Sequence, residues 1–497
     1  MSILNHIADM KLAKVLKGLI SAQSIGNMEV DVNDIAYHAT SVTPGGCFVA
    51  IRGFKTDGHQ YVSEAVAKGA KVVVVEREMS LPENITQIVV EDTRDALARL
   101  SARFFEDPSQ DLNLIGITGT NGKTTVVYLL EEMFRTEGWM PGIWSTISAR
   151  YGTVVQDSQR TTPEAYDLQK FLRGMVDFGV THAAMEVTSH AVELKRTVGC
   201  HFNGGVFTNL SPEHLDFHGD METYFLAKEK FFRERLMVSE KKNVWAVINI
   251  DDPYGRKLCK GLPLKVLRYS LQEPVELQGV ITCSDLNGTR MIIHSPAGSF
   301  DCSSPMIGKF NMQNVLAATG AALSSGVSVS SIQTTLAQFS GAPGRLMPIS
   351  NTRGFHVFVD YAHTPNALEN VLGALRPLTK GKMIVVFGCG GDRDRLKRPQ
   401  MGLAVANVAD TMIVTSDNPR SEDPEKIMNE IIPGILEAGK KSFETIVDRK
   451  QAIARAVEVA RPGDCVVVAG KGHERYQEIG TKRIPMDDAN LLRELLK

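Results

Sequence analysis

Short continuous runs of apolar residues recur along most of the chain, a pattern typical of buried β-strands. In the middle part of the chain they lie at residues 112–117, 183–187, 205–208 and 244–250. After residue 344 they lie at 357–360, 382–387, 412–415 and 465–469. Strands that are covered by helices on both faces of a sheet are apolar on both sides, so these runs predict two mostly parallel sheets.

Helical patterns separate these runs, and the first part of the chain differs from the rest. Helices are predicted at 126–134, 365–375 and 398–408. The first 95 residues mix strands at 47–51 and 71–75 with a helix at 61–68. A break rich in glycine and proline, residues 341–344, divides the remainder of the chain.

These elements predict an α/β protein of three domains, which agrees with the usual domain size for a chain of 497 residues. Residues 1–95 form a small N-terminal α/β module. Residues 96–341 form a central domain with a P-loop-like, mostly parallel sheet, and residues 342–497 form a Rossmann-like, doubly wound C-terminal domain.

The composition excludes several classes of function. Lys and Arg number 55 and Asp and Glu number 57, without a run of like charge, so the charge favours neither nucleic acid nor a membrane surface. Met1–Ile20 lacks the features of a signal peptide, and no segment approaches the roughly 20 apolar residues of a membrane span. The seven cysteines have no CxxC spacing, so neither a zinc site nor a disulfide framework is indicated. We expect a cytoplasmic protein that works as a monomer.

Polar and glycine-rich residues follow the predicted strands. These segments are 186–190, 208–214, 360–365, 388–393, 416–420 and 470–474. In open α/β sheets, ligands bind beyond the carboxyl ends of the strands. A sheet that served only as a scaffold would have little need of such residues there, so we expect the functional site to be built from these segments.

The segment Ile115–Thr125, Ile-Gly-Ile-Thr-Gly-Thr-Asn-Gly-Lys-Thr-Thr, resembles a phosphate-binding loop between a strand and a helix. Lys123 supplies positive charge, and Thr124 stands where a P-loop places the hydroxyl that contacts magnesium. The candidate nucleotide contacts are Gly119, Thr120, Asn121, Gly122, Lys123, Thr124 and Thr125. Ile117 replaces the first glycine of the usual pattern. The segment predicts a site for a magnesium nucleotide, of an unusual type.

Thr124, Glu186 and His214 are candidate magnesium ligands. Magnesium prefers hard oxygen donors and keeps several waters. A carboxylate directly after an apolar strand is costly to bury unless it is paired or bound to metal, which favours Glu186. Histidine matches magnesium poorly, and His214 is also compatible with a structural hydrogen bond near a turn.

Lys228 lies on the apolar face of a predicted helix at 221–236, four residues from Tyr224 and Phe232 and three from Phe231. Two interpretations remain open. The side chain packs its stem on the core and extends its charged end to water. Alternatively, CO2 adds to the neutral amine, and the resulting carbamate holds a second magnesium ion.

Other candidates lie in loops and at a helix start. Arg345 is placed to neutralise a phosphate, although a loop arginine is often a surface residue. Asn311 and Asn314 carry amides suited to a base or ribose, or they cap a helix. Arg420 offers a planar fork for a carboxylate, or it pairs with Glu422 or Asp423.

Together these segments resemble the Mur ligase family over essentially the whole chain, and within it the MurE type, which adds the third amino acid of the peptidoglycan stem peptide. The resemblance rests on the following stretches: Thr118–Thr125, Glu186–His190, Thr208–Ser211 with His214–Asp216, Tyr224–Lys228, Val359–Pro365 and Gly470–Glu474. It implies that Glu186, His214 and a carbamylated Lys228 bind magnesium.

The resemblance also implies substrate contacts. Thr161, Thr162, Thr188 and Arg196 would contact a UDP-muramoyl dipeptide, and Arg393, Asp417, Asn418, Pro419, Arg420, Gly470 and Glu474 would hold the incoming amino acid. The stretch Asp417–Arg420 resembles the signature of enzymes that use meso-diaminopimelate, which differs from lysine by a second carboxylate. The planar guanidinium of an arginine can bind that carboxylate with two hydrogen bonds, so it favours meso-diaminopimelate over lysine.

The implied reaction is an ATP-dependent amide ligation through an acyl phosphate. Lys123, a pair of magnesium ions and Arg345 would offset charge between the substrate carboxylate and the triphosphate. His363 or Asp360 would accept the proton of the amine.

Two stretches depart from the family pattern. His38-Ala39-Thr40 stands where the family usually has Asp-Ser-Arg, so we transfer no uridine contact to that loop, and Met347 replaces a common glutamate. The alternatives are a lysine-adding enzyme of the same type, a folylpolyglutamate synthase, a P-loop switch or motor protein, and a dinucleotide oxidoreductase. Arg420 argues against the lysine-adding enzyme, and the N-terminal module argues against the folylpolyglutamate synthase. Ile117 argues against the P-loop switch or motor protein, and the lack of G-x-G-x-x-G at Gly388–Gly391 argues against the oxidoreductase.

Overall fold

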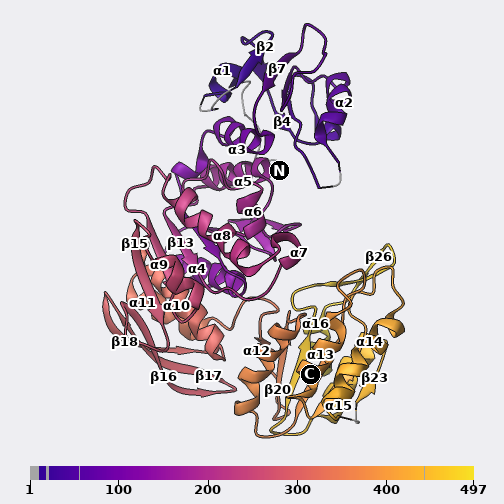
Figure 1. The fold of residues 1–497 in the computed structure, drawn as a ribbon. Helices are drawn as coiled ribbons and strands as arrows, with labels where there is room; N and C mark the ends of the chain where they lie inside the picture. Colours follow the sequence, from indigo (N-terminus) through magenta and orange to yellow (C-terminus); the bar gives the residue numbers. More distant parts are fainter. Residues whose placement is uncertain (1–9, 18, 20–21, 55, 441–442) are drawn as a thin grey trace. The chain divides into compact units, whose positions relative to one another are not determined.

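The computed structural model describes residues 10–17, 19, 22–54, 56–440 and 443–497. The first nine residues of the N-terminal segment considered above lie outside these ranges. The chain divides into two compact units. One comprises the residues up to 270 with 317–328, and the other comprises 271–316 with 329–497 (Figure 1). Each is an α/β structure.

The first unit begins with a five-stranded sheet in the order β2 (Gln23–Ile25), β7 (Thr86–Val89), β6 (Val72–Val75), β5 (Cys47–Val49), β4 (Ile35–Ala36). All neighbours are parallel except β2 and β7. Helix α3 (Thr93–Phe104) packs on the face that carries Val72 and Val74, and α2 (Val62–Ala67) packs on the face that carries Val73 and Val75. Burial on both faces explains why β6 is an unbroken run of valine.

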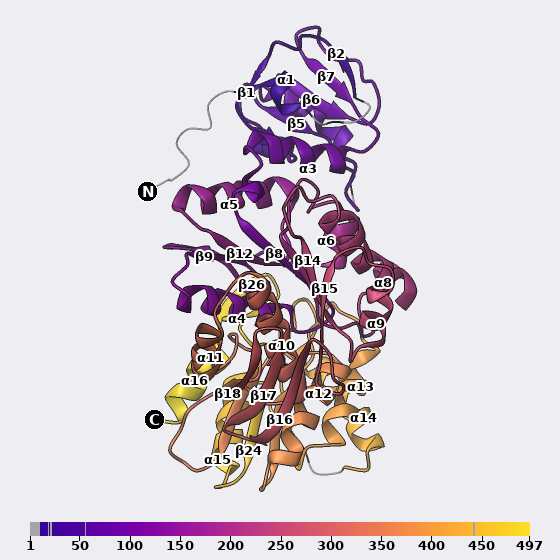
Figure 2. The same ribbon diagram turned by 90° about the vertical axis from the view of Figure 1, so that its left-hand side faces the viewer.

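A second, mostly parallel sheet follows in the same unit, in the order β9 (Pro141–Trp144), β12 (His182–Glu186), β8 (Asn113–Thr118), β13 (Gly204–Phe207), β14 (Trp245–Asn249), β15 (Lys265–Ser270). Antiparallel strands β10 (Ser148–Tyr151) and β11 (Val154–Asp157) extend it beside β9. Figure 2 shows β9, β12 and β8 with α5 (Ala165–Phe178) on one side and α4 (Lys123–Thr136) on the other. Because β12, β8 and β13 are adjacent and parallel, their carboxyl ends lie at the same edge of the sheet.

The second unit contains a six-stranded sheet in the order β19 (Met347–Pro348), β20 (His356–Asp360), β24 (Cys465–Ala469), β21 (Met383–Phe387), β22 (Thr411–Val414), β23 (Glu444–Thr445). Only β19 is antiparallel to its neighbour. One face packs against α12 (Pro365–Leu375), α13 (Lys397–Ala406) and α14 (Pro424–Glu437), and the other against α15 (Arg449–Val459) and α16 (Asp488–Leu495). Successive residues of β24 alternate between the two cores, so the sheet is doubly wound as expected.

One part of the fold differs from the mostly parallel sheet expected for residues 96–341. β16 (Leu277–Asp285), β17 (Gly288–Ser295) and β18 (Gly298–Ser304) form an antiparallel meander, on which α11 (Val329–Gln338) packs. Its strands are buried on one face only, as β17 shows with Thr289, Met291 and Ile293 buried and the residues between them more exposed. Polar residues on the other face interrupt the apolar pattern.

The predicted α/β class with parallel-rich sheets is confirmed, whereas the boundaries 1–95, 96–341 and 342–497 stay predictions. Among the described residues, no helix combines the length and the apolar composition that crossing a bilayer requires.

Candidate functional site

The predicted phosphate loop joins β8 to α4 through residues 119–122. Gly122, at the helix start, has a φ of +88°, and Gly119 has a φ of +145°. A Cβ on Gly119 would lie 1.9 Å from the Thr208 hydroxyl oxygen, so only glycine fits there. Ile117 is a fully buried residue of β8, between Glu186 of β12 and Val206 of β13. The usual first glycine is absent because the strand continues through this position.

Contacts with the segment after β13 hold the loop in place. The Thr120 amide donates to the Asn209 carbonyl at 2.9 Å, and the Asn121 amide donates to Asn209 Oδ1 at 2.9 Å. The Thr208 hydroxyl donates to the Asn121 carbonyl at 2.6 Å. Lys123 folds back, so that its Nζ donates to the Gly119 and Thr120 carbonyls at 3.0 and 2.8 Å. The loop is thus held in shape by contacts within the protein.

Buried Glu186 accepts hydrogen bonds from two threonines. Its Oε1 accepts from the Thr124 hydroxyl at 2.8 Å and from the Thr146 amide at 2.7 Å, and its Oε2 accepts from the Thr146 hydroxyl at 3.1 Å. The Thr161 hydroxyl lies 3.1 Å from that of Thr146. These bonds offset the cost of burying a carboxylate. Sequence reasoning missed Thr146, which lies between β9 and β10 and belongs to no motif. The hydroxyl and carboxylate oxygens suit magnesium.

His214 directly precedes the short helix α7 (Leu215–His218), and its φ is +57°. Its ring centroid lies 4.9 Å from that of His190 and 6.2 Å from that of Tyr224. Its Nε2 lies 3.8 Å from Glu213 Oε2, which is too far for a hydrogen bond. Burial lowers the pKa of His214, so the neutral ring that a metal requires is favoured. Its role as a ligand stays a prediction.

Lys228 lies near the end of α8 (Met221–Lys230), and the chain then continues as a π-helical turn over Phe231–Leu236. Only 2% of Lys228 is exposed, so the interpretation in which its charged end reaches water is wrong. Its Nζ donates to the Gly119 carbonyl at 2.9 Å and lies 4.6 Å from the centre of the Tyr224 ring. Burial holds the pKa of this amine well below its usual value. The carbamate itself stays a prediction.

The residues expected to contact a dipeptide substrate lie around the end of β12. The Thr162 hydroxyl donates to the Glu186 carbonyl at 2.8 Å and lies 3.3 Å from the Thr188 hydroxyl. Arg196 donates through Nη1 to the Thr162 carbonyl at 3.1 Å and pairs through Nε with Glu164 at 2.6 Å. With Thr161, these residues form one polar group beside the phosphate loop.

In the second unit, Arg345 lies over an aromatic ring, with its guanidinium carbon 4.8 Å from the centre of the Tyr361 ring. Its Nε is buried and has no hydrogen-bond partner among the described residues. The next residue, Leu346, has a φ of +43° and donates its amide to Asp360 at 2.6 Å. Arg345 thus keeps hydrogen-bonding capacity for a ligand, which agrees with the predicted phosphate role and leaves it untested.

The two candidates for the proton acceptor differ in how their acceptor atoms are used. Asp360 is buried, and its two carboxylate oxygens accept amides of Leu346 and Ala362. His363 Nδ1 lies 2.8 Å from the Tyr361 carbonyl, so Nδ1 carries the proton and Nε2 is an acceptor. Burial is the main cause that lowers the pKa of His363. This geometry favours His363 over Asp360.

Asn311 and Asn314 lie in the first turns of α10 (Lys309–Ser324) and are buried. Neither caps the helix, because Gly308 precedes it and its carbonyl accepts the Asn311 amide. The Asn311 side-chain amide donates to the Ile307 carbonyl at 2.9 Å, and the Asn314 amide lies 3.4 Å from Asn311 Oδ1. Contact with a base or ribose stays a prediction.

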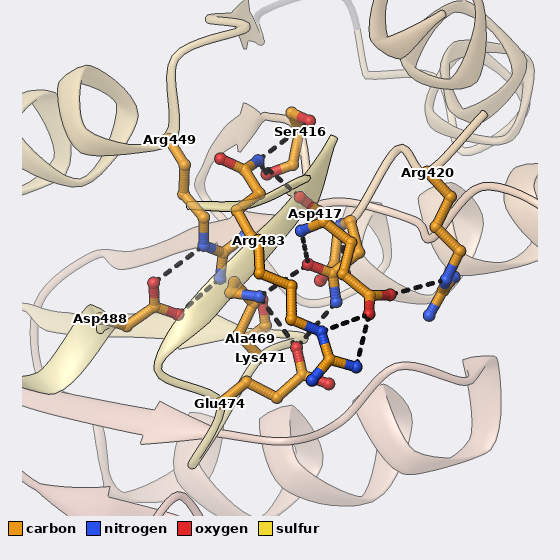
Figure 3. Close-up of polar contacts among 12 residues, drawn as sticks. Ser416, Asp417, Arg420, Arg449, Ala469, Lys471, Glu474, Arg483 and Asp488 are labelled. Atoms are coloured by element: carbon orange, nitrogen blue, oxygen red, sulfur yellow. Dashed lines mark hydrogen bonds and ion pairs between the residues drawn. The ribbon is translucent and has the colours of Figure 1, made fainter. Parts of the chain in front are cut away.

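The candidate amino-acid pocket centres on a buried lysine that sequence reasoning did not single out (Figure 3). Lys471 Nζ is fully buried and donates to Asn418 Oδ1 at 3.0 Å and to Glu474 Oε2 at 2.8 Å. Asn418 Nδ2 donates to the same Glu474 oxygen at 2.8 Å. The Gly470-Lys471-Gly472 stretch suggested a loop, and its lysine could have been noted as a charge at a strand end.

Asp417 and Gly470 fit closely together at the ends of β22 and β24. Gly470 has a φ of +113°, and a Cβ on it would lie 2.6 Å from Asp417 Oδ2. Asp417 Oδ1 accepts the Asn418 amide at 2.7 Å, whereas Oδ2 is buried without a hydrogen-bond partner among the described residues. A carboxylate oxygen left open in this way suits an ammonium group.

Arg420 does not pair with Glu422, so that alternative is wrong. Its Nε pairs with Glu478 Oε2 at 3.0 Å, and its Nη1 donates to the Gly391 carbonyl at 2.7 Å. Glu422 pairs instead with buried Arg398 at 2.8 Å.

The remaining candidates of this pocket lie beside Arg420. Asp423 caps α14 by accepting the Glu425 amide at 2.9 Å. Arg393 is exposed and donates to the Asp392 carbonyl at 3.3 Å. A Cβ on Gly391 would lie 1.9 Å from the Pro419 carbonyl oxygen, so these two loops are in close contact.

A buried ion pair supports the pocket from behind. Arg449 of α15 binds Asp488 of α16 through Nε at 2.9 Å and Nη2 at 2.7 Å, and both side chains are fully buried. Nη2 also donates to the Ala469 carbonyl at the end of β24 at 3.0 Å (Figure 3). Both helices are thereby tied to the strand that leads into Gly470.

Comparison with known families gives matches in three successive segments. Residues 31–105 match the "Mur ligase family, catalytic domain", residues 117–322 the "Mur ligase middle domain", and residues 344–472 the "Mur ligase, glutamate ligase domain". The chain is 40% identical over 488 residues to the UDP-N-acetylmuramoyl-L-alanyl-D-glutamate--2,6-diaminopimelate ligase of Syntrophomonas wolfei, covering 98% of this chain and 99% of that protein.

Solved structures agree with these matches. One, of a UDP-N-acetylmuramoyl-L-alanyl-D-glutamate--2,6-diaminopimelate ligase, is 32% identical with a TM-score of 0.71 and covers 98% of this chain and 99% of that one. The MurF ligase of Thermotoga maritima in complex with ADP has the same fold, with 21% identity, a TM-score of 0.59 and coverage of 88% and 94%. From the matches over most of its length, the chain belongs to the Mur ligase family.

Proposed function

We propose that the protein is an ATP-dependent ligase that joins meso-diaminopimelate to the D-glutamyl carboxylate of UDP-N-acetylmuramoyl-L-alanyl-D-glutamate, a step in peptidoglycan precursor synthesis. Relatives that bear the name of this activity support the proposal. The observation that carries it is the meeting of three groups at one loop: the Thr124 hydroxyl, the Glu186 carboxylate and the buried Lys228 amine.

The phosphate loop binds the triphosphate of ATP. Its contacts are the amides of residues 119–122, the Lys123 ammonium and the amino end of α4 with Thr125. Asn311 and Asn314 approach the ribose or base. A related structure that holds ADP supports this nucleotide class.

Thr124, Glu186, His214 and a carbamate formed from CO2 on Lys228 would hold a pair of magnesium ions. These ions supply positive charge against the phosphate oxygens. The residues fit this task because Thr124 and Glu186 are hard oxygen donors and Lys228 is buried, which lowers the pKa of its amine and favours the neutral form that attacks CO2. Addition of CO2 forms an N–C bond and releases one proton, which leaves an anionic carbamate.

The chemistry has two steps. The substrate carboxylate attacks the γ-phosphorus and ADP leaves, which gives an acyl phosphate. The amine of the incoming amino acid then attacks the acyl carbon, phosphate leaves, and the amine loses a proton to His363 Nε2. Lys123 and Arg345 reduce the repulsion between the carboxylate and the triphosphate. Thr161, Thr162, Thr188 and Arg196 orient the dipeptide.

Selection of meso-diaminopimelate depends on Arg393, Asp417–Arg420, Gly470 and Glu474. Arg420 binds the distal carboxylate through the N–H groups that Glu478 and Gly391 leave open. Glu474 binds the distal ammonium through Oε1, because Lys471 and Asn418 occupy Oε2. L-Lysine lacks the distal carboxylate, so a lysine-adding enzyme is the weaker candidate. We further infer that the enzyme is a cytoplasmic monomer that acts on small molecules.

An amino-acid panel tests the proposal. The purified protein is incubated with UDP-N-acetylmuramoyl-L-alanyl-D-glutamate, ATP and magnesium, and with meso-diaminopimelate or L-lysine, and phosphate release and product mass are measured. We expect one phosphate per amide formed, and turnover with meso-diaminopimelate far above that with L-lysine. Equal turnover of both amino acids, or phosphate release without amide, contradicts the proposal.

A further inference from the structure

A small hairpin holds the loop that carries Arg420. Its strands are β25 (Tyr476–Ile479) and β26 (Lys482–Pro485), which follow the Gly470–Glu474 segment. The Arg420 amide donates to the Glu478 carbonyl at 3.0 Å, and the Gly480 amide donates to the Arg420 carbonyl at 2.7 Å. Both main-chain groups of Arg420 are therefore bonded to the hairpin.

These bonds maintain an unusual backbone conformation. Arg420 has a φ of +50°, in the left-handed region that residues with side chains seldom adopt. Such a conformation persists only where neighbouring structure fixes it. The hairpin supplies that restraint, and the conformation determines the direction in which the Arg420 side chain leaves the loop.

Glu478 also fixes the end of this side chain. Its Oε2 accepts from Arg420 Nε at 3.0 Å, while Nη1 donates to the Gly391 carbonyl at 2.7 Å. A Cβ on Gly390 would lie 3.1 Å from Nη1, so the guanidinium rests against this glycine loop. Since arginine has five N–H donors, the remaining ones are already oriented for a ligand.

Glu478 reaches two further members of the pocket. Its backbone amide donates to Asn418 Oδ1 at 3.0 Å, which connects it to the group around Glu474. Its Oε1 accepts from Arg483 of β26, at 3.1 Å from Nη2. Figure 3 shows the side chains of Arg420 and Arg483 directed toward the same carboxylate. The two arginines offset its negative charge, so a second carboxylate can approach Arg420.

We propose that Glu478 is a specificity-positioning residue, which holds the Arg420 guanidinium in the orientation that binds a carboxylate on the distal carbon of a diamino dicarboxylic acid. The inference rests on the proposed function. It adds the residue that orients Arg420, which is proposed to select meso-diaminopimelate. A long side chain that is already held loses less conformational freedom when the ligand binds, so affinity for the distal carboxylate rises. Glu478 does not touch the reacting atoms, so its effect is confined to amino-acid binding.

Steady-state kinetics test this inference with four variants: Glu478→Ala, Glu478→Gln, Arg420→Met, and the double variant that combines Glu478→Ala with Arg420→Met. We expect Glu478→Ala to raise KM for meso-diaminopimelate about tenfold or more, while kcat and KM for ATP stay within about twofold. Glu478→Gln, which keeps an oxygen acceptor for Nε, restores part of the loss. In the Arg420→Met background, removal of Glu478 has no further effect on this KM.

Lys482→Ala is the matched control, because Lys482 is an exposed residue of the same hairpin and pairs with Ile479 through its backbone. Its KM values should equal those of the wild type. Any one of three results overturns the inference. The KM for meso-diaminopimelate is unchanged in Glu478→Ala, the effect of removing Glu478 is equally large in the Arg420→Met background, or all KM values rise together with a lower Tm. Failure of the wild type to use meso-diaminopimelate overturns the proposed function instead, so the two failures are distinguishable.

Discussion

Lys228 Nζ donates a hydrogen bond to the carbonyl of Gly119 at 2.9 Å, so an amine from α8 is held against the phosphate loop in the protein interior. No carboxylate in the described part of the chain forms an ion pair with this amine, so its burial costs free energy, and burial is the main cause that lowers its pKa. Groups with such perturbed pKa values cluster at functional sites, which supports the catalytic role proposed for Lys228.

Lys228→Met tests this conclusion, because methionine keeps most of the apolar stem. We expect kcat/KM to fall at least about 100-fold, since a ligand for charge stabilisation is lost. The Tm should stay equal or rise, because a buried polar group is replaced by an apolar one. Thermal melts and steady-state rates check both. A large drop in Tm alongside lost activity would show a structural role instead.

Gly119→Ala should abolish tight nucleotide binding. The added Cβ would lie 1.9 Å from the Thr208 hydroxyl oxygen, and the φ of +145° does not suit alanine. We expect the Kd for ADP, measured by calorimetry, to rise about tenfold or more. Gly138→Ala is the matched control: its φ is +86°, but a Cβ there meets nothing within 4 Å. It should cost about 1 kcal/mol of stability and leave ADP binding unchanged. Equal Kd values for the two variants would refute this account of the loop.

Asp488→Ala should strongly destabilise the second unit. It leaves the Arg449 guanidinium buried without its carboxylate, which costs about 3–5 kcal/mol. Denaturant unfolding measures the loss. Replacement of both partners, Arg449→Met with Asp488→Leu, should cost less than the single change. Glu444→Ala breaks the half-exposed pair with Arg455 and should cost under about 1 kcal/mol. A similar cost for the two single variants would contradict the role assigned to burial.

The acid limb of the pH–rate profile should lie below pH 6.5, the ordinary pKa of histidine, if His363 accepts the proton of the amine. Burial lowers the pKa of His363, so the neutral, active form persists to lower pH. The unfolded chain takes up this proton first, so the contribution of His363 to stability also falls as pH drops below about 6.5. His363→Asn should lower kcat and remove this limb. An unchanged limb in that variant excludes His363 as the acceptor.

Thiol labelling at pH 8 should discriminate among the cysteines. Burial raises the pKa of five thiols to about 12, so they carry little reactive thiolate; they are Cys47, Cys200, Cys302, Cys389 and Cys465. Cys283 is exposed on β16 and should react first with iodoacetamide, as mass spectrometry of peptides would show. Fast modification of Cys389, which lies in the core of the second unit, would contradict the structure there.

Elements buried on both faces were predicted well because their sequence is continuously apolar. The strand 465–469 has the predicted bounds. The helix 365–375 also has them, but for another reason: its apolar residues recur at helical spacing and are buried on one face only. The meander at 277–304 was not predicted, since only alternate residues of its strands are buried. The π-helical turn after Lys228 has no sequence signature, yet it alters the spacing from which the neighbours of this lysine were inferred.

Candidate site residues were named from the sequence where a motif carries them, and their neighbours were missed where only tertiary structure brings them together. Thr146 reaches Glu186 from the turn after β9, and no pattern marks it. The partner of Arg420 was sought among its sequence neighbours, whereas Glu478 lies 58 positions further along. Electrostatic partners are chosen by distance in space, and a single sequence gives no information on contacts between segments this far apart.

Helix α16 stabilises the second unit, because its Asp488 neutralises the buried Arg449 side chain. A variant shortened at residue 487 would keep every strand of the six-stranded sheet, but the buried cationic side chain of Arg449 would lose its Asp488 counter-ion. Trimmed versions made for crystallisation should therefore retain this last helix.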